Sequence, residues 1–235
     1  MLVLGIDTSA VAASCAVCDM QENGCRVIMS GTINAKQTHS QTMLPMLESL
    51  LKGSALKLDD IDRFAVSAGP GSFTGLRIGI SAVKGMAFAS NKPCAAVSTL
   101  EALAYNLMGR KGIACAVMDA RCNQVYNALF RIDGESVTRL TADRALFLPD
   151  LAEEIKNYNE QIILVGDGAE LTYRIINGEN ITIAPPMLRF QHGESVCLAS
   201  RNYPDISAKE LMPGYLRLPQ AERERLEREK KEGQK

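Results

Sequence analysis

The stretch AGPGSFTGLRIG, residues 68–79, lies between a short apolar run and a long helical pattern of small residues. It lacks the Gly-Lys-Ser/Thr of a Walker loop, and its third glycine, Gly75, comes one position too late for the dinucleotide fingerprint. What remains is a tight Gly-Pro-Gly turn, with Ser72 or Thr74 as the cap of the following helix. The stretch therefore predicts a strand, a turn that aims a helix, and amides at the helix start that are able to hold an anion.

Strands and helices alternate on both sides of this stretch. The apolar patterns predict strands at 2–6, 12–17, 26–33, 64–67 and 94–97, and helices at 40–52, 75–89 and 99–108. This order predicts a mixed sheet flanked by helices, which is an α/β fold.

The opening plan is repeated in the second half of the chain. The apolar run at 113–118 ends in Asp119-Ala120-Arg121 before a strand at 124–131, as the run at 2–6 ends in Asp7-Thr8-Ser9 before the second strand. Such self-similarity indicates an internal duplication. The second unit also carries predicted strands at 162–165 and 181–184 and predicted helices at 146–155 and 195–200.

The duplication sets the expected domain boundaries. We expect a first domain at 1–108, with 206–220 packing back on it, and a second, smaller domain at 109–205. Residues 221–235 alternate acidic and basic side chains and predict a charged tail, either a solvated helix or a disordered segment.

Composition excludes several classes of function. Among 235 residues, 46% are hydrophobic, the formal net charge is −1 and there is no Trp, so no basic footprint or aromatic platform for direct RNA binding stands out. No run is long enough to span a membrane, and the opening MLVLGID is too short and lacks the basic start of a signal peptide. Seven cysteines scattered among apolar runs suit a reducing compartment. We therefore expect a cytoplasmic protein with no membrane association.

Motifs over nearly the whole chain give a specific resemblance to a known family. GIDTSA at 5–10, THSQTMLPMLESLL at 38–51, AGPGSFTGLRIGISAVKGMAFA at 68–89, VSTLEALA at 97–104, DARCNQVYNALF at 119–130 and PGYLR at 213–217 occur in order. Together they resemble the TsaB family, formerly YeaZ, a subunit of the bacterial machinery that makes threonylcarbamoyladenosine beside the tRNA anticodon. The resemblance implies the actin-like, Hsp70-like and sugar-kinase fold, with two duplicated domains of the ribonuclease H type.

The resemblance also implies where a nucleotide would lie. In that fold, two turns that carry an Asp face a nucleotide held between the domains. The matching residues here are Asp7, Thr8, Ser9, Gly69, Gly71 and Ser72. Neither segment contains Lys or Arg, so we expect any nucleotide binding by this chain alone to be weak.

Two helices of the first domain are apolar over most of their circumference. In the helix at 75–89 only a narrow polar strip remains, and small residues four apart allow another helix to approach closely. One interpretation is a deep core helix; the other, which we favour, is a partner surface that would form a homodimer in the absence of its partner. Its predicted residues are His39, Met43, Met46, Leu47, Leu50, Gly75, Leu76, Gly79, Ile80, Val83 and Met86.

Catalysis is where this chain departs from its homologues. The catalytic subunit TsaD has an Asn-His-Leu-Glu-Gly-His segment in which two histidines hold a metal, whereas this chain has STLEAL at 98–103. Thr99 and Leu103 stand at the positions of those histidines, and neither binds a divalent metal as imidazole does. We therefore expect no catalytic residue, no metal site and no cofactor bound by this chain alone.

The resemblance implies a role as a partner subunit. The chain would pair with TsaD and recruit TsaE, and it would contact tRNA only through the complex, in which ATP and a metal ion come through the partners. Two alternatives stay open. One is an independent small-molecule kinase of the same fold that uses Asp7 or Asp119, and the other is a glycoprotease-like peptidase.

Overall fold

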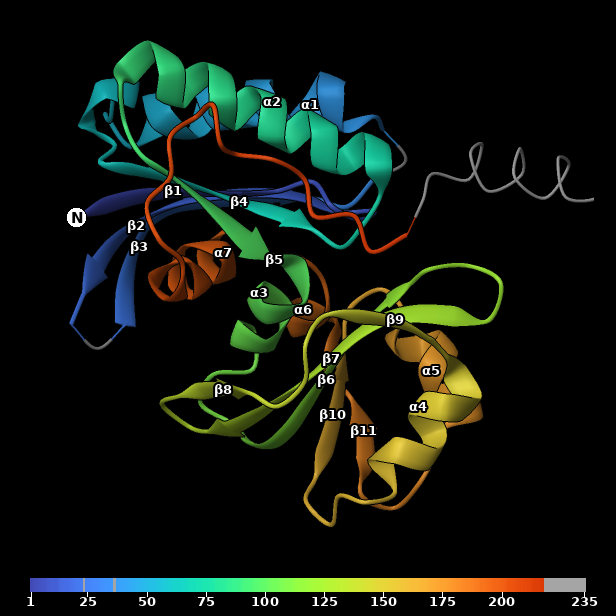
Figure 1. Cartoon of the computed structure of the whole chain (residues 1–235). Helices are drawn as coiled ribbons and strands as arrows, with labels where there is room; N and C mark the ends of the chain where they lie inside the picture. Colours follow the sequence, from blue (N-terminus) through green and yellow to red (C-terminus); the bar gives the residue numbers. More distant parts are fainter. Residues whose placement is uncertain (23, 36, 218–235) are drawn as a thin grey trace, which may run out of the picture.

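Two mixed sheets with matching strand orders form the chain (Figure 1). The computed structural model describes residues 1–22, 24–35 and 37–217, so the prediction for a charged tail at 221–235 lies outside the described residues. The first sheet has the order β3-β2-β1-β4-β5 and the second β11-β10-β6-β7-β8, with β9 paired to β7. These strands are β1 (Leu2–Asp7), β2 (Ala13–Gln21), β3 (Gly24–Ile33), β4 (Arg63–Gly69), β5 (Cys94–Ser98), β6 (Lys111–Asp119), β7 (Gln124–Asp133), β8 (Val137–Arg139), β9 (Arg144–Phe147), β10 (Ile162–Val165) and β11 (Ile181–Ile183).

The pairing directions repeat as well as the order. In each unit the first strand, β1 or β6, pairs antiparallel with the strand that follows it and parallel with β4 or β10. This equivalence confirms the predicted fold class and the internal duplication.

Helices cover both faces of the first sheet. Side chains of β1 alternate between the faces, so Leu4 and Ile6 join the core beneath α1 and α2, while Val3 joins the core with α7. Figure 1 shows α1 and α2 on one side of this sheet and α7 on the other. The helices of this unit are α1 (His39–Gly53), α2 (Phe73–Ser90), α3 (Thr99–Tyr105) and α7 (Gly193–Ala199), with short 3-10 turns η1 (Leu58–Asp60) and η2 (Ser200–Asn202).

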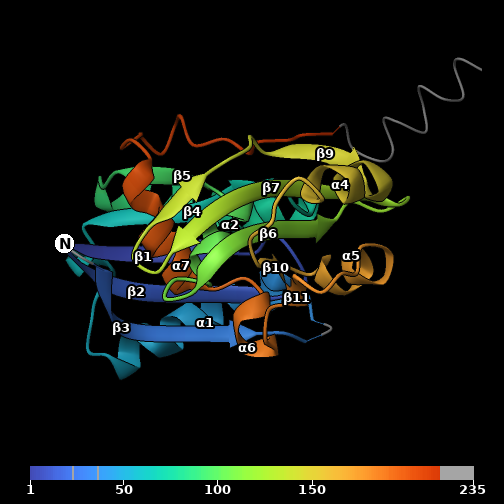
Figure 2. The ribbon, with the colours of Figure 1, turned by 90° about the horizontal axis from the view of Figure 1, so that it is seen from below.

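The second sheet is covered in the same way. One face packs on α4 (Leu148–Ile155) and α5 (Ala169–Ile175), which lie beside each other in Figures 1 and 2. The other face packs on α3, whose Leu100 and Leu103 share a core with Phe130 of β7. The short α6 (Pro186–Arg189) leads back toward the first unit. Helix α3 thus packs between the two units.

The return of the chain to the first unit begins earlier than predicted. The boundary at 205 placed α7 in the second domain, but α7 packs on β1 and β2 of the first sheet. Two glycines make this contact close, because a Cβ on Gly5 would lie 2.3 Å from the Gly193 carbonyl oxygen and a Cβ on Gly193 would lie 2.5 Å from the Ala16 nitrogen. Of the predicted return segment 206–220, residues 206–216 contact the first unit, starting with a backbone bridge between Ile206 and Cys94, and Arg217 bonds Ala120 of the second unit. Residues 218–220 lie outside the described residues.

Helix α2 begins where the glycine stretch predicted. Ser72 is its N-cap and accepts a hydrogen bond from the Gly75 amide at 3.3 Å, and Asn91 ends it in a left-handed conformation with φ of 52°. A Cβ on Gly75 would lie 2.0 Å from the Thr8 carbonyl oxygen, and one on Gly79 would lie 2.5 Å from Thr8 Oγ1. The small residues of α2 therefore admit the chain's own turn after β1, not a second helix.

This contact corrects part of the predicted partner surface. Seven of its eleven residues are buried in the core of the first unit, and buried side chains do not form a free surface. They are Met43, Leu47, Gly75, Leu76, Gly79, Ile80 and Val83. For these positions the alternative interpretation, a deep core helix, is the right one.

Within the described residues, no helix combines the length and apolar character that crossing a membrane requires.

Candidate functional site

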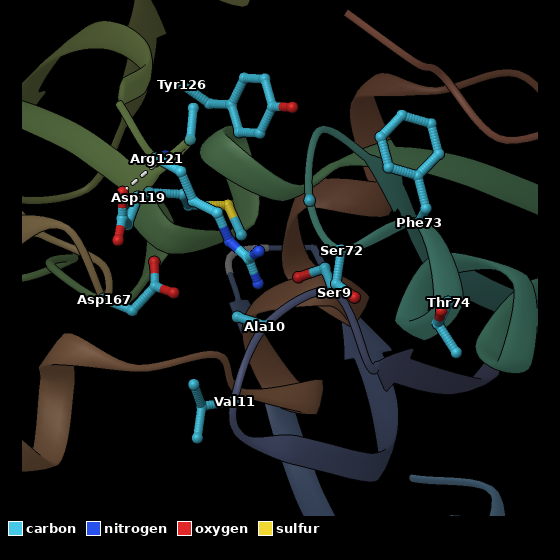
Figure 3. Close-up of a pocket in the computed structure, with 13 residues that line it drawn as sticks. Ser9, Ala10, Val11, Ser72, Phe73, Thr74, Asp119, Arg121, Tyr126 and Asp167 are labelled. Carbon is cyan, nitrogen blue, oxygen red and sulfur yellow. Dashed lines mark hydrogen bonds between the residues drawn. The ribbon is translucent and has the colours of Figure 1, made fainter. Parts of the chain in front are cut away.

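A cleft of about 570 Å³ opens between the two units, at the ends of β1 and β6 (Figure 3). Both duplicated turns and the glycine stretch contribute to its walls. The first unit lines it with Ser9, Ala10, Val11, Gly71, Ser72, Phe73 and Thr74, and the second with Met118, Asp119, Ala120, Arg121, Tyr126 and Asp167.

The turn after β1 is sealed inside the first unit. Asp7 is fully buried, and its two carboxylate oxygens accept hydrogen bonds from the Ser9 amide at 2.8 Å, from the Ser9 hydroxyl at 2.6 Å and from the Ser67 hydroxyl. Burial raises the pKa of Asp7, although the bonds from Ser67 and Ser9 act in the opposite direction. Thr8 donates to the Gly75 carbonyl at 2.7 Å. The polar groups of this turn therefore brace β1, β4 and α2 against one another.

The turn after β6 is open to the cleft. Asp119 is exposed and accepts a hydrogen bond from the Arg121 amide at 2.7 Å. Figure 3 shows the Arg121 side chain extending from this turn toward Ser9 and Ser72 of the first unit. The turn is also strained, since Arg121, Cys122 and Asn123 have φ of 63°, 54° and 56°, values that residues with a side chain rarely adopt.

Asp167 is the second carboxylate of the cleft. It follows β10, and its Oδ1 is buried without a hydrogen-bond partner among the described residues. Burial, helped by the like charge of Asp119, raises the pKa of Asp167 to about 6. Asp119 and Asp167 are thus close enough for their charges to interact in this wall of the cleft.

The start of α2 offers few donors to an anion. The Ser72 amide is bound to the Ser9 carbonyl at 2.7 Å, and the Gly75 amide is bound to Ser72 Oγ. The amides of Phe73 and Thr74 remain, because the first turn of a helix has no intrahelical acceptor for them. Two carboxylates, Asp119 and Asp167, and the guanidinium of Arg121 line the cleft opposite these amides, so groups of both signs would face an anion there. Weak nucleotide binding by this chain stays a prediction.

The structure divides the predicted nucleotide residues into two groups. Ser9, Gly71 and Ser72 line the cleft, whereas Asp7 and Thr8 are buried behind it. Gly69 also lies away from the cleft, where its φ of 133° and close contact with Gly214 exclude a side chain, since a Cβ would lie 2.3 Å from the Gly214 carbonyl oxygen. The structure thus places Asp7, Thr8 and Gly69 outside the lining of the cleft, which does not support their predicted contact with a nucleotide.

Sequence reasoning missed several side chains of the cleft, among them Phe73, Arg121, Tyr126 and Asp167. A signal for Asp167 is present, because Gly166-Asp167-Gly168 follows a buried strand and ligands of open α/β sheets bind at the carboxyl ends of strands.

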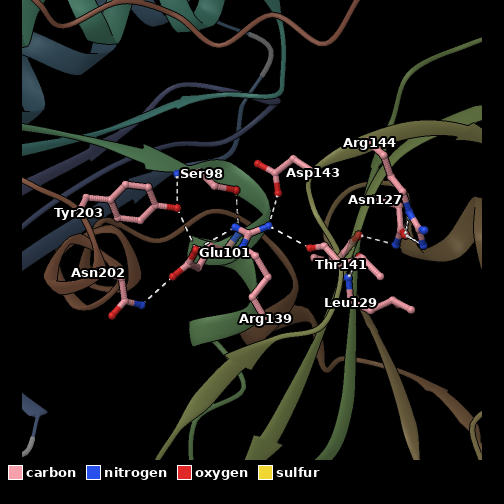
Figure 4. Close-up of polar contacts among 11 residues, drawn as sticks. Ser98, Glu101, Asn127, Leu129, Arg139, Thr141, Asp143, Arg144, Asn202 and Tyr203 are labelled. Atoms are coloured by element: carbon pink, nitrogen blue, oxygen red, sulfur yellow. Dashed lines mark hydrogen bonds and ion pairs between the residues drawn. The ribbon is translucent and has the colours of Figure 1, made fainter.

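The segment aligned with the metal ligands of TsaD is a packed helix here. Thr99 is fully buried and Leu103 is 1% exposed, so both positions are part of the core around α3. Within the described residues, no three His, Cys, Asp or Glu side chains converge as metal ligands. Glu101 lies between Thr99 and Leu103 in the sequence. Its carboxylate accepts hydrogen bonds from Arg139 and Tyr203 at 2.8 Å each and from Asn202 at 2.7 Å (Figure 4). This helix thus carries an ion pair that joins the units.

The outer surface of α1 and α2 keeps part of the predicted partner surface. His39, Met46, Leu50 and Met86 are half-buried. Beside them, Leu44 of α1 is 51% exposed, and Ile78 and Ala82 of α2 are half-buried. We call these seven residues the α1–α2 surface.

Fold and cleft together define a class of protein, an actin-like chain of two duplicated α/β units with a cleft between them. The family model of TsaD, described as tRNA N6-adenosine threonylcarbamoyltransferase, matches residues 33–202. The tRNA threonylcarbamoyladenosine biosynthesis protein TsaB of Bacillus subtilis is 29% identical over 98% of this chain and 100% of its own length, and that of Escherichia coli is 32% identical over 72% of each. The solved structure of YeaZ from Pseudomonas aeruginosa has a TM-score of 0.75 at 27% identity and covers 92% of this chain and 99% of that one. The chain belongs to the TsaB (YeaZ) family.

Proposed function

We propose that this chain is a non-catalytic subunit in the biosynthesis of threonylcarbamoyladenosine in tRNA. It would pair with TsaD, recruit TsaE and contact tRNA only through that complex in the cytoplasm. Relatives that share nearly its full length carry the name of this pathway, which supports the role.

The observation that carries the non-catalytic role is the sealed turn of the first unit. A catalytic carboxylate has to reach substrate or metal, but both oxygens of Asp7 are used by Ser9 and Ser67 inside the fold. The burial of Thr99 and Leu103 in the core around α3 points in the same direction. ATP and a metal ion would then be held by the partners.

The α1–α2 surface is the proposed site of pairing. Arg77 and Lys84 on one flank of α2 contact the chain's own C-terminal segment at Tyr215 and Met212, so that flank is covered. A separate apolar row on α2 is formed by residues four apart, Ile78, Ala82 and Met86. In the absence of TsaD, this row offers a second copy of the chain a symmetric contact, and a homodimer would cover it.

A matched pair of charge substitutions tests this surface. Leu44→Glu places a charge on the α1–α2 surface, and Ile175→Glu places one on α5, where the side chain is 48% exposed compared with 51% for Leu44. We expect Leu44→Glu to weaken TsaD binding and self-association about tenfold or more, because burying a charge opposite apolar atoms is unfavourable. Calorimetry and light scattering measure both. Equal binding by the two variants, with intact circular dichroism, would refute the assignment.

The kinase alternative would use Asp119, which is exposed to the cleft, beside the partly buried Asp167. Turnover of ATP by the purified chain, abolished by Asp119→Ala, would support it. The peptidase alternative predicts one zinc ion per chain in elemental analysis, whereas our proposal predicts none.

A further inference from the structure

We propose that residues 211–217, which we call the strap, tie the two units together across the mouth of the cleft and limit how far it opens. The strap contains the Pro-Gly-Tyr-Leu-Arg motif at 213–217. In Figure 1 this C-terminal segment, drawn orange to red, runs along α2 and ends between the two units. The inference concerns motion of this chain and goes beyond the proposed function.

The strap is anchored firmly on the first unit. Leu211 is fully buried in the core beneath α2, and the Gly214 amide donates to the Ala68 carbonyl at 2.7 Å. Tyr215 then stacks on Phe73, with ring centroids 4.5 Å apart, and its hydroxyl accepts from Arg77 Nε at 2.8 Å. Because Phe73 lines the cleft, these contacts fix the strap at the rim of the first unit.

The strap reaches the second unit through its last described residue. Arg217 Nη1 donates to the carbonyl oxygen of Ala120 at 2.6 Å, a charge-assisted hydrogen bond. Ala120 precedes the three residues with positive φ in the turn after β6. A strained backbone conformation persists only where the surrounding structure stabilises it. The hydrogen bond from Arg217 is one such stabilising contact, and the strap supplies it.

A second contact between the units is the ion pair between Glu101 of α3 and Arg139 of β8. There Glu101, 7% exposed, receives hydrogen bonds from Arg139 of β8 and from Asn202 and Tyr203 of the C-terminal segment (Figure 4). Arg63 of β4 also binds the Tyr203 carbonyl at 2.7 Å, which connects this network to the first sheet.

The two ties differ in strength. At the Glu101 contact one donor from the second unit, Arg139, meets a carboxylate that is 7% exposed and is also held by Asn202 and Tyr203 of the first unit. Among the described residues, the strap meets the second unit through the hydrogen bond from Arg217 to the neutral Ala120 carbonyl. An ion pair to a buried carboxylate that is held by further donors resists opening more than one hydrogen bond to a backbone carbonyl does. The units should therefore pivot about the Glu101 network, and release of Arg217 should be the step that widens the cleft.

Spin-label distances test the strap directly. We would label Ser81→Cys on α2 and Arg174→Cys on α5, both exposed, in a chain in which exposed Cys122 and half-buried Cys25 are replaced by Ser. Arg217→Met keeps the apolar stem and removes the donor. Its matched control is Arg131→Met, which breaks an exposed ion pair with Glu160 inside the second unit.

We expect Arg217→Met to broaden the distance distribution about twofold and Arg131→Met to leave it unchanged. Hydrogen exchange at the Ala120 and Gln124 amides should rise about tenfold in Arg217→Met, while Arg217→Lys, which keeps a donor, should fall in between. Unchanged distances and exchange in a folded Arg217→Met chain would overturn the proposal. So would an equal response from the Arg131→Met control.

Discussion

The two duplicated turns start from the same plan and end in opposite states. Asp7 is fully buried with every oxygen partnered, whereas Asp119 is exposed to the cleft. Strand register explains the difference. Asp7 lies one residue beyond the last parallel pair, Ile6 with Val66, so it meets Ser67 of the neighbouring strand.

In the second unit the first strand extends further past its neighbour. The last parallel pair is Ala116 with Val165, and Asp119 lies three residues beyond it, out of reach of β10. The duplication therefore yields one turn that holds the first unit together and one turn that faces whatever enters the cleft. A shared strand plan does not fix a shared role, because a difference of two residues in how far the first strand extends past its neighbour decides it.

The strongest test of the comparison is a pair of identical exchanges in α2. Gly75→Ala places a methyl group 2.0 Å from the Thr8 carbonyl oxygen, whereas Gly85→Ala meets nothing within 4 Å. We expect Gly75→Ala to lower the free energy of unfolding by at least about 3 kcal/mol. Gly85→Ala should raise it by roughly 0.5–1 kcal/mol, since alanine is the better helix former. Urea denaturation measures both, and a mild effect at Gly75 would mean that the turn and α2 are not in close contact.

The carboxylates of the two turns give the next largest contrast. Asp7→Ala leaves the Ser9 amide and the Ser9 and Ser67 hydroxyls buried without their acceptor, so we expect a loss of about 2 kcal/mol in the free energy of unfolding. Asp119→Ala should change it by no more than about 0.5 kcal/mol, as expected for an exposed residue. Equal losses in thermal unfolding would contradict the distinction between a sealed and an open turn.

The second-unit wall of the cleft should also make the stability of the fold depend on pH, through Asp167. Asp167 has a pKa of about 6 in the folded chain against an ordinary 3.8, so the unfolded chain ionises it more easily. Its contribution to stability therefore falls as pH rises from about 4 to 6, and the penalty is complete above that window.

We expect Asp167→Asn to raise the free energy of unfolding by about 1 kcal/mol at pH 7.5 and to have little effect at pH 4. Unfolding curves of the variant and the parent, compared at each pH, isolate this group from the other carboxylates. A gain of the same size at both pH values would show that the shift in pKa does not cause it.

Much of the fold follows from local sequence patterns, and the failures have a common cause. Apolar runs predicted the first sheet, the duplication and four strands of the second sheet, and the Gly-Pro-Gly turn predicted the start of α2. They did not predict the short strands β8 and β9, and the helix predicted at 146–155 overlaps the end of β9. Small residues at 75 and 79 show that something approaches α2 closely, but not whether it is a partner or the chain's own Thr8. The early return of α7 to the first sheet is likewise a contact between residues nearly 180 positions apart, as in the bond from the Gly193 amide to Ser14.

The cleft was predicted only in part for the same reason. The resemblance predicted that both turns with an Asp would face a nucleotide. The sequence does not show that the Ser67 hydroxyl donates a hydrogen bond to the Asp7 carboxylate inside the fold. Asp119 and Asp167 are 48 positions apart in the sequence, and they come together because β6 and β10 pair in the sheet.

The smallest expected effect concerns nucleotide binding. Two amides and the Arg121 guanidinium share the cleft with two carboxylates, so we expect the isolated chain to bind ATP no more tightly than about millimolar, the range of a few polar contacts. Titration calorimetry at pH 7.5 measures it, with Ser72→Ala as a variant that alters the first-unit wall. Micromolar affinity would contradict this expectation and show that attraction by groups such as Arg121 outweighs repulsion by the two carboxylates.

The central claim is that this chain supports the modification of tRNA without taking part in its chemistry. It is tested most directly by reconstitution with TsaD and TsaE from the same organism, in which threonylcarbamoyl transfer to tRNA is measured with this chain omitted, intact, or carrying Asp119→Ala. We predict that omission abolishes transfer and that Asp119→Ala retains it at near-parental rates. Loss of transfer in Asp119→Ala, with folding and TsaD binding intact, would contradict the account and make the open turn part of the reaction.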